Sequence, residues 1–310
     1  MAPFLSDPFR GFRERRRLAP DETSRSMELG AIRRALDAAR LAGEDIDALI
    51  CTSFLPDIPD VGNAAYLARD IGTRGPAWNL EATCSSPLVG LQTACALVGA
   101  GEYRRILYVA SCCYSRATPD SDSLAWANGD GAVAFVVGPV PEGEGLLSST
   151  LVNTAETCGA LSLRLEVDGG VARVRMFADK KATRALREQA EDYLLRSVRP
   201  ALDRAGVKLE DIRFFAFTTP TAWYARFCAR ALGIPLERTV TTHALYANVG
   251  PALTLTNLFH AAHRGLVARG DLVLLYVIGS TANTGAAVMR WGEVALGPIS
   301  ERELSASVAP

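Results

Sequence analysis

The chain of 310 residues lacks several features that would assign it to a common functional class. No apolar run reaches the roughly 18 residues of a membrane-spanning helix, and no apolar stretch follows the first arginines as in a secretory signal. The chain has only three histidines, and no third ligand accompanies His260 and His263, so we expect no metal site. A Walker loop and a Gly-x-Ser-x-Gly elbow are also absent.

Neither sign of charge dominates, since 33 Lys and Arg face 34 Asp and Glu. This balance argues against a nucleic-acid binder. The seven cysteines are an odd number and include the neighbours Cys112 and Cys113, which does not suit a disulfide framework. We therefore expect a reducing, cytoplasmic environment. The 49% of hydrophobic residues is typical of a soluble globular protein with a large core.

One local excess of charge is the basic cluster Arg13, Arg15, Arg16 and Arg17. Its simplest interpretation is a solvated face. The alternative is a landing patch for a carrier that bears phosphate.

The strongest sign of organisation is an internal repeat. The letters ALD at 35–37 and EDI at 44–46 recur at 201–203 and 210–212, both at an offset of 166 residues. An apolar run follows each copy. This pattern predicts an amphipathic helix, a short polar turn and a buried strand, twice.

The repeat continues further along the chain. CSSP at 84–87 opens one predicted helix and NVGP at 248–251 opens another, each with a proline in a favourable first turn. The strand-like letters LYV at 107–109 recur at 275–277. Each half therefore reads helix, strand, helix, strand, helix, strand, strand.

This order predicts an α/β protein with two similar halves, residues 1–145 and 146–310. The apolar helices after Cys84 and Asn248 are expected in the centre, shared between two sheets. Chance similarity among alanine-rich helices is the alternative, but several pairs match in the same order.

A set of motifs in this order resembles the thiolase superfamily, and within it ketoacyl synthase III. The motifs are GFRER at 11–15, ATCSS at 82–86, GDGA at 129–132, ANVGPA at 247–252 and GST at 279–281. The resemblance implies a thiolase-like duplicated αβαβα layered fold, with two mixed sheets around central helices. It also implies acyl transfer without a tightly bound cofactor. Acyl-CoA or a phosphopantetheinyl acyl carrier protein is then a substrate and partner, and the protein a dimer.

Two departures from the family stand out. Its members have about 30 more residues at the start. Either the start of this sequence is misplaced, or the first strand of the first half is missing, and its loss would expose a sheet edge. The family's catalytic histidine is also absent. Without gaps Thr218 takes its place, and with a small gap Thr219 or Thr221 does.

Cys84 is the predicted nucleophile. It lies just before a helix, where unpaired N–H groups lower the pKa of a thiol. A thiolate there can attack a thioester and form an acyl enzyme. The alternative, a buried structural cysteine, fits other cysteines of the chain better.

The resemblance assigns further roles. The backbone N–H groups of Cys84 and Ser280 are the expected oxyanion donors. Asn248 either directs its amide at the second acyl group or caps a helix, and the two roles are compatible. His243 is a weaker candidate for a compensating base. Arg13, Arg15 and Arg16 are candidates for the phosphate of the carrier.

The leading hypothesis is condensation of an acyl group on Cys84 with a malonyl-type thioester, in fatty-acid-like or specialised-metabolite biosynthesis. An O- or N-acyltransferase that does not decarboxylate is one alternative. A non-catalytic subunit that pairs with another ketosynthase, rather than forming a homodimer, is the other. A cysteine hydrolase lacks an identifiable histidine partner.

Overall fold

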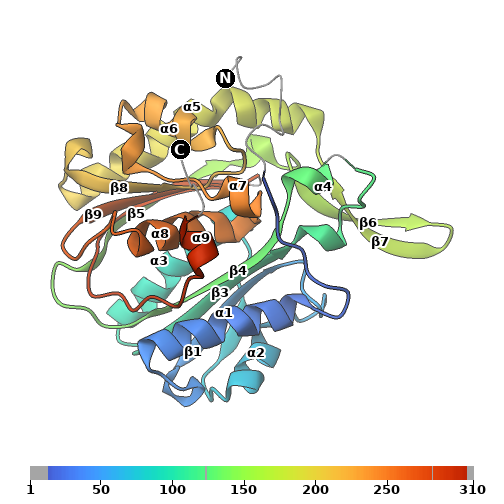
Figure 1. Ribbon diagram of the computed structural model, residues 1–310, viewed down its shortest axis with the longest axis horizontal. Helices are drawn as coiled ribbons and strands as arrows, with labels where there is room; N and C mark the ends of the chain where they lie inside the picture. The colour runs from blue at the N-terminus through green and yellow to red at the C-terminus, as the bar shows by residue number, and fades with distance from the viewer. Residues whose placement is uncertain (1–12, 123, 281, 306–310) are drawn as a thin grey trace.

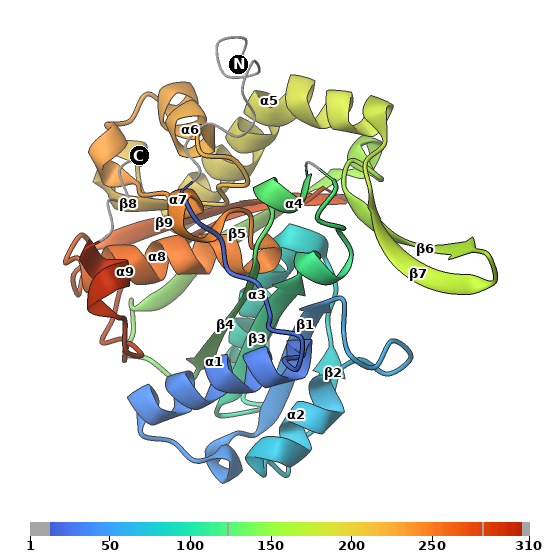
Figure 2. The same ribbon diagram turned by 45° about the vertical axis from the view of Figure 1, so that its right-hand side comes forward.

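The computed structural model describes residues 13–122, 124–280 and 282–305. In this part of the chain two main β-sheets alternate with layers of helices (Figure 1). The middle layer holds α3 (Ser86–Gly99) and α8 (Leu253–His263), which lie between the sheets in both views (Figure 2). The predicted αβαβα layering is therefore confirmed.

The first sheet has the strand order β2-β1-β3-β4. Strand β1 pairs in parallel with β2 and β3, whereas β4 runs antiparallel to β3. Helices α1 and α2 cover its outer face (Figure 1). The bounds are β1 (Ala48–Phe54), β2 (Ala77–Asn79), β3 (Ile106–Cys113), β4 (Asp130–Val137), α1 (Ser24–Ala39) and α2 (Ala64–Ile71).

The second sheet has the strand order β5-β10-β9-β8. Strands β8 and β9 are parallel, and β10 runs antiparallel to both β9 and β5. Helices α5 and α6 cover its outer face (Figure 1). The bounds are β5 (Gly145–Thr154), β8 (Ile212–Phe217), β9 (Leu272–Ile278), β10 (Ala282–Arg290), α5 (Lys180–Ala205) and α6 (Tyr224–Leu232).

The repeat read from the sequence matches this arrangement. Strands β1, β3 and β4 hold the same places in the first sheet as β8, β9 and β10 in the second. The polar turns Gly43–Asp45 and Leu209–Asp211 are both 3-10 turns. The sheets differ at both edges. Strand β5 pairs with β10, whereas no strand in the described residues pairs with the outer edge of β4, and β2 pairs with β1, whereas no described strand extends the second sheet beyond β8.

Burial explains why β3, β9 and α3 consist mainly of apolar residues. Every residue of β3 and β9 is buried, as expected for strands covered by helices on both faces. Helix α3 is apolar all round because it contacts both sheets. It approaches the first sheet closely, since a Cβ atom on Gly90 would lie 2.1 Å from the Tyr108 ring.

The remaining elements lie outside the two sheets. The hairpin of β6 (Ser162–Asp168) and β7 (Val171–Phe177) projects from the body in both views (Figures 1 and 2). Short helices are α4 (Leu124–Ala127), α7 (His243–Tyr246) and α9 (Glu301–Ser305). Among the described helices none is long and apolar enough to cross a membrane.

Candidate active site

Cys84 lies where the two halves meet. It occupies the 3-10 turn Thr83–Ser85, directly before α3, and Pro87 is in the first turn of that helix as predicted. This turn packs against the 3-10 turn Gly250–Ala252, which opens α8. The residue is 9% exposed. The starts of the two central helices therefore converge on the predicted nucleophile.

Backbone strain is concentrated around this point. Thr83, Ala247 and Ala282 have φ angles of 52°, 59° and 60°, a region that residues with a Cβ atom rarely adopt. Each lies within two residues of a predicted site residue. Such conformations cost about 1–3 kcal/mol each and persist where surrounding packing enforces them, typically at functional sites.

The turn that contains Ser280 lies against the Cys84 turn. A Cβ atom on Gly279 would lie 2.7 Å from Thr83 Oγ1 and 2.9 Å from Ser85 Oγ. Only glycine fits this approach without displacing its neighbours. The structure therefore brings the two expected oxyanion donors, at Cys84 and Ser280, onto adjoining turns.

Asn248 closes the same region from the second half. Its backbone N–H donates to the Ala127 carbonyl at 3.0 Å, and its carbonyl accepts from the Gly129 N–H at 2.9 Å. Its side-chain oxygen accepts the Gly250 N–H at 2.9 Å, which closes a local turn before the 3-10 turn. The predicted N-cap role is wrong, because Val249 holds the cap position of Gly250–Ala252 and Ala252 that of α8. The amide nitrogen makes no hydrogen bond within the described residues. The bond to Gly250 therefore leaves this nitrogen free to reach a substrate.

The predicted lowering of the Cys84 pKa is wrong for the unliganded protein. Burial raises the pKa of its thiol to about 11, and the Glu81 carboxylate adds to the rise. The Tyr114 hydroxyl and the Cys84 backbone N–H act in the opposite direction without overcoming burial. A thiolate between the two halves loses its hydration, and this outweighs its place before a helix.

Thr218 lies just beyond the end of β8, behind the start of α8. Its hydroxyl pairs with the Thr254 hydroxyl at 2.6 Å and approaches the Tyr276 carbonyl at 3.4 Å. It is 1% exposed. The hydroxyl is therefore engaged in packing α8 against the sheet.

His243 is the first residue of α7 and is buried. Burial lowers the pKa of its imidazole to about 4, although the Thr219 carbonyl favours the protonated form. The ring is neutral at pH 7. It is a much weaker base than the histidine near neutral pH that the sequence prediction assumed.

The arginine cluster lies on the segment that runs past α7 and α4 (Figure 2). Arg13 is exposed. The Arg15 guanidinium lies 5.4 Å from the centre of the Trp126 ring, and Arg16 forms an ion pair with Glu14 at 3.2 Å. Partners within the chain therefore already engage part of this charge.

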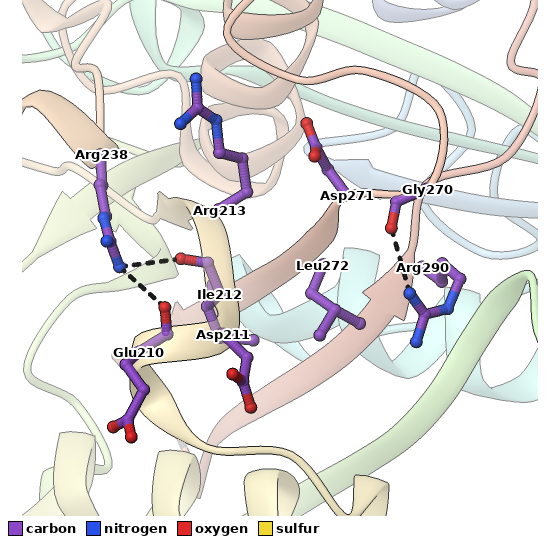
Figure 3. Close-up of a pocket in the computed structure, with 9 residues that line it drawn as sticks. All are labelled: Glu210, Asp211, Ile212, Arg213, Arg238, Gly270, Asp271, Leu272 and Arg290. Atoms are coloured by element: carbon purple, nitrogen blue, oxygen red, sulfur yellow. Dashed lines mark hydrogen bonds between the residues drawn. The ribbon is translucent and has the colours of Figure 1, made fainter.

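A pocket of about 300 Å³ lies elsewhere, at the beginnings of β8 and β9 (Figure 3). Arg238 spans its rim and donates to the carbonyls of Glu210 and Ile212, both at 3.2 Å. Both acidic and basic side chains line it. Cys84 lies near the opposite ends of the strands, so this pocket is not the candidate active site. Its lining is Glu210, Asp211, Ile212, Arg213, Arg238, Gly270, Asp271, Leu272 and Arg290.

Sequence reasoning missed two neighbours of Cys84. Glu81 accepts the backbone N–H of Thr83 at 2.5 Å, and the Tyr114 hydroxyl acts to lower the pKa of the Cys84 thiol. The closeness of Glu81 in sequence was a usable signal, whereas Tyr114 lies 30 residues further along the chain. Within the described ranges no group of His, Cys, Asp and Glu could hold a metal ion.

Comparison with known proteins places this geometry in a family. Residues 78–155 match 3-oxoacyl-[acyl-carrier-protein (ACP)] synthase III, and residues 202–291 match the C-terminal part of that family. These ranges contain Cys84, Asn248 and Ser280.

Whole proteins give the same result. Beta-ketoacyl-[acyl-carrier-protein] synthase III of Chelativorans sp. (strain BNC1) is 30% identical, over 91% of this chain and 88% of that protein. Synthase III 3 of Streptomyces coelicolor is 31% identical, over 86% and 83%. The structure of the synthase III from Thermus thermophilus superposes with a TM-score of 0.82 at 29% identity, over 91% and 88%. The chain therefore belongs to the 3-oxoacyl-[acyl-carrier-protein] synthase III family.

Proposed function

We propose that this protein takes an acyl group from acyl-CoA or an acyl carrier protein onto Cys84 and condenses it with a malonyl-type thioester. The observation that carries the proposal is the convergence of three turns on this cysteine: Thr83–Ser85, Gly250–Ala252 and the turn at Gly279. The names of the related synthases support the reaction type.

In the first step the Cys84 sulfur attacks the thioester carbon of the donor. The oxygen of the tetrahedral intermediate gains charge, and the backbone N–H groups of Cys84 and Ser280 are the proposed donors to it. The bond between the acyl carbon and the carrier sulfur then breaks. The acyl group remains on Cys84, and the carrier leaves as a thiol.

In the second step a malonyl thioester loses carbon dioxide, and the resulting carbanion attacks the acyl group. The free amide nitrogen of Asn248 is the proposed donor to the enolate oxygen. We assign Thr218 to the position of the family's histidine, and its hydroxyl is engaged by the Thr254 hydroxyl. The pKa of His243, lowered to about 4 by burial, leaves that imidazole neutral as well.

These two observations favour a second candidate, acyl transfer to a hydroxyl or an amine without decarboxylation. With one side-chain donor in place of two, the enolate is less stabilised, so the condensation is expected to be slow. Both candidates share the acyl group on Cys84.

The donor would approach across the arginine segment. Acyl-CoA and acyl carrier proteins both present a phosphopantetheine arm, and Arg13, Arg15 and Arg16 supply the positive charge on that side. Of these, Arg13 is the most exposed and the best placed to meet a phosphate. We also propose a dimer, as a homodimer or with a second ketosynthase chain.

Incubation with acyl-CoA followed by intact-mass measurement tests the first step. An adduct on the wild type that is absent from Cys84→Ala supports the proposal. No adduct, or an equal adduct on both proteins, contradicts it. A protein that takes up no acyl group and co-purifies with a second synthase chain is instead a non-catalytic subunit.

Labelled malonyl thioester then separates the two candidates. Release of labelled carbon dioxide that depends on Cys84 supports condensation. Transfer of the acyl group to a hydroxyl or amine acceptor, without this release, supports the second candidate.

A further inference from the structure

Tyr114 lies near the Cys84 turn, and its buried hydroxyl has no hydrogen-bond partner among the described residues. It follows the last residue of β3 and opens the 3-10 turn Tyr114–Arg116. Its side chain is buried, and the hydroxyl forms no well-aligned hydrogen bond with any described residue. The hydroxyl oxygen lies beside Gly250, whose turn packs against the Cys84 turn, and this hydroxyl acts to lower the pKa of the Cys84 thiol. A buried polar group without a partner is unfavourable and calls for an explanation.

Packing fixes the position of this hydroxyl. The Phe54 ring meets the Tyr114 ring edge-on, with centroids 5.3 Å apart. On the other side, a Cβ atom on Gly250 would lie 2.7 Å from the hydroxyl oxygen. The absence of a side chain at Gly250, whose φ angle is 52°, therefore makes room for the tyrosine hydroxyl at the start of α8.

The backbone around Tyr114 is also anchored. The Ser115 N–H and hydroxyl donate to the Asp130 carboxylate at 2.9 and 2.5 Å, and the Leu18 N–H donates to it at 2.8 Å. Asp130 thus holds together three segments that are distant in the sequence. Asp130 is therefore a structural residue of its turn.

We propose that Tyr114 donates a hydrogen bond to the Cys84 sulfur when that sulfur is a thiolate, and so helps to form the nucleophile. This inference rests on the proposed acylation of Cys84. A thiol is a weak acceptor, whereas a charged sulfur accepts strongly. A thioester sulfur is again a weak acceptor, so the bond is strongest in the reactive state.

Tyr114 acts as a donor and not as a base. Burial holds the pKa of its phenol well above the usual value, so it keeps its proton throughout. In the balanced step, the bond from the Cys84 sulfur to the acyl carbon forms and the bond from that carbon to the carrier sulfur breaks. The proton of Cys84 passes, in sum, to the carrier thiol that leaves.

Other titratable groups near the pair come from two elements. Cys112 on β3 is fully buried, and burial raises its pKa well above the usual value, so it stays neutral. Glu81 precedes the Cys84 turn and opposes the thiolate. The turn Gly250–Ala252 contributes no titratable side chain. Tyr114 is therefore the side chain that favours a charged sulfur at this point.

The test compares Tyr114→Phe with the matched control Tyr224→Phe. Tyr224 is also buried, its hydroxyl likewise lacks a well-aligned hydrogen bond, and it lies on the far side of the second sheet, at the start of α6. The readout is the rate at which iodoacetamide alkylates Cys84 between pH 7 and 9.5, followed by peptide mass spectrometry. A parallel series measures single-turnover acylation by acyl-CoA.

We expect Tyr114→Phe to raise the Cys84 pKa by about one unit, which lowers the thiolate fraction about tenfold at pH 7. The more basic thiolate is a better nucleophile and recovers part of this loss, so both rates should fall about three- to tenfold. Tyr224→Phe should leave both curves unchanged. A Tyr114→Phe protein that reacts at the wild-type rate at every pH of the series overturns the inference.

A second variant removes the risk that Tyr114→Phe merely fails to fold. Tyr114→3-fluorotyrosine keeps the packing and makes the phenol a stronger donor, so both rates should rise. No change in rate contradicts the inference. If alkylation responds in both variants but no protein takes up an acyl group, the proposed function fails while the pairing of Tyr114 with Cys84 stands.

Discussion

The Glu81 carboxylate accepts a hydrogen bond from the backbone N–H of Thr83, the residue directly before Cys84. This bond helps to hold Thr83 at its unusual φ angle of 52°. Burial is the main cause of the raised pKa of the Cys84 thiol, and the charge of the same carboxylate raises it further. Glu81 therefore supports the shape of the turn while it opposes charge on the sulfur.

Glu81→Gln should separate these two effects. The glutamine oxygen can still accept the Thr83 N–H, but the negative charge is lost. We expect a lower Cys84 pKa and alkylation by iodoacetamide that is about two- to tenfold faster at pH 7, a direction opposite to that of Tyr114→Phe. Glu102→Gln, at an exposed acid beyond α3, is the control. Slower alkylation of Glu81→Gln would mean that the hydrogen bond matters more than the charge.

Gly279→Ala should disturb the site with little effect on the rest of the fold. The new methyl group would lie 2.7 Å from Thr83 Oγ1 and 2.9 Å from the Asn283 carbonyl, and the backbone atom cannot move aside cheaply. A displacement of about 1 Å can cost 100-fold in rate, so single-turnover acylation should fall about that much. Gly99→Ala, where a Cβ atom has nothing within 4 Å, should acylate normally.

Thr83→Gly should make the protein more stable and less active. Relief of the left-handed conformation is worth about 1–2 kcal/mol, and removal of a buried, unpaired hydroxyl adds to this. The entropy of glycine in the unfolded chain offsets about 0.5–1 kcal/mol. We expect a net gain of about 1 kcal/mol in urea unfolding and slower acylation from a looser turn. A less stable variant would show that Thr83 is not strained.

Glu28 should make stability depend on pH. It is buried in α1, where its carboxyl oxygens accept the Ser53 and Ser111 hydroxyls, both at 2.5 Å, and the Asn63 amide at 2.8 Å. Burial raises its pKa from 4.5 to about 7, so the folded state holds the proton more tightly than the unfolded state does. The free energy of unfolding should therefore fall as the pH rises from about 4.5 to 7. The full loss, above pH 7, is about 3 kcal/mol.

Urea unfolding of the wild type and Glu28→Gln at pH 5 and pH 7.5 measures this effect. Groups common to both proteins cancel in the comparison, including Asp57, whose pKa is lowered. The loss of stability between the two pH values should be smaller in Glu28→Gln by about 2 kcal/mol, since part of the full loss has already occurred at pH 5. Equal losses in the two proteins would show that Glu28 titrates normally.

Local patterns in the sequence were enough to predict the elements. The offset of 166 residues gave both polar turns and the strands after them, because helix and strand periodicities depend on near neighbours. The position of Cys84 before a helix was also readable, because Pro87 and the small residues around it favour a helix start. The same local signals placed Asn248 just before the 3-10 turn that leads into α8.

The electrostatics of the site depend on contacts that no local pattern contains. The burial of Cys84 arises from the turn at Gly250, which is 166 residues away in the sequence, and from the turn at Gly279. Tyr114 is positioned by Phe54 and Gly250, each more than 50 residues away. The direction of the pKa shift and the proposed role of Tyr114 therefore depend on contacts that form only in the folded chain.

The unequal edges of the two sheets have a consequence for isotope labelling. In the second sheet β10 bonds to strands on both sides, so its amide hydrogens should be protected from deuterated water along its whole length. Strand β4 has only β3 beside it among the described strands, so along residues 131–137 alternate N–H groups point away from the sheet. Two strands with equivalent places in the repeat should thus label differently. Deuterium should enter β10 slowly at every amide, whereas in β4 every second amide should exchange fast.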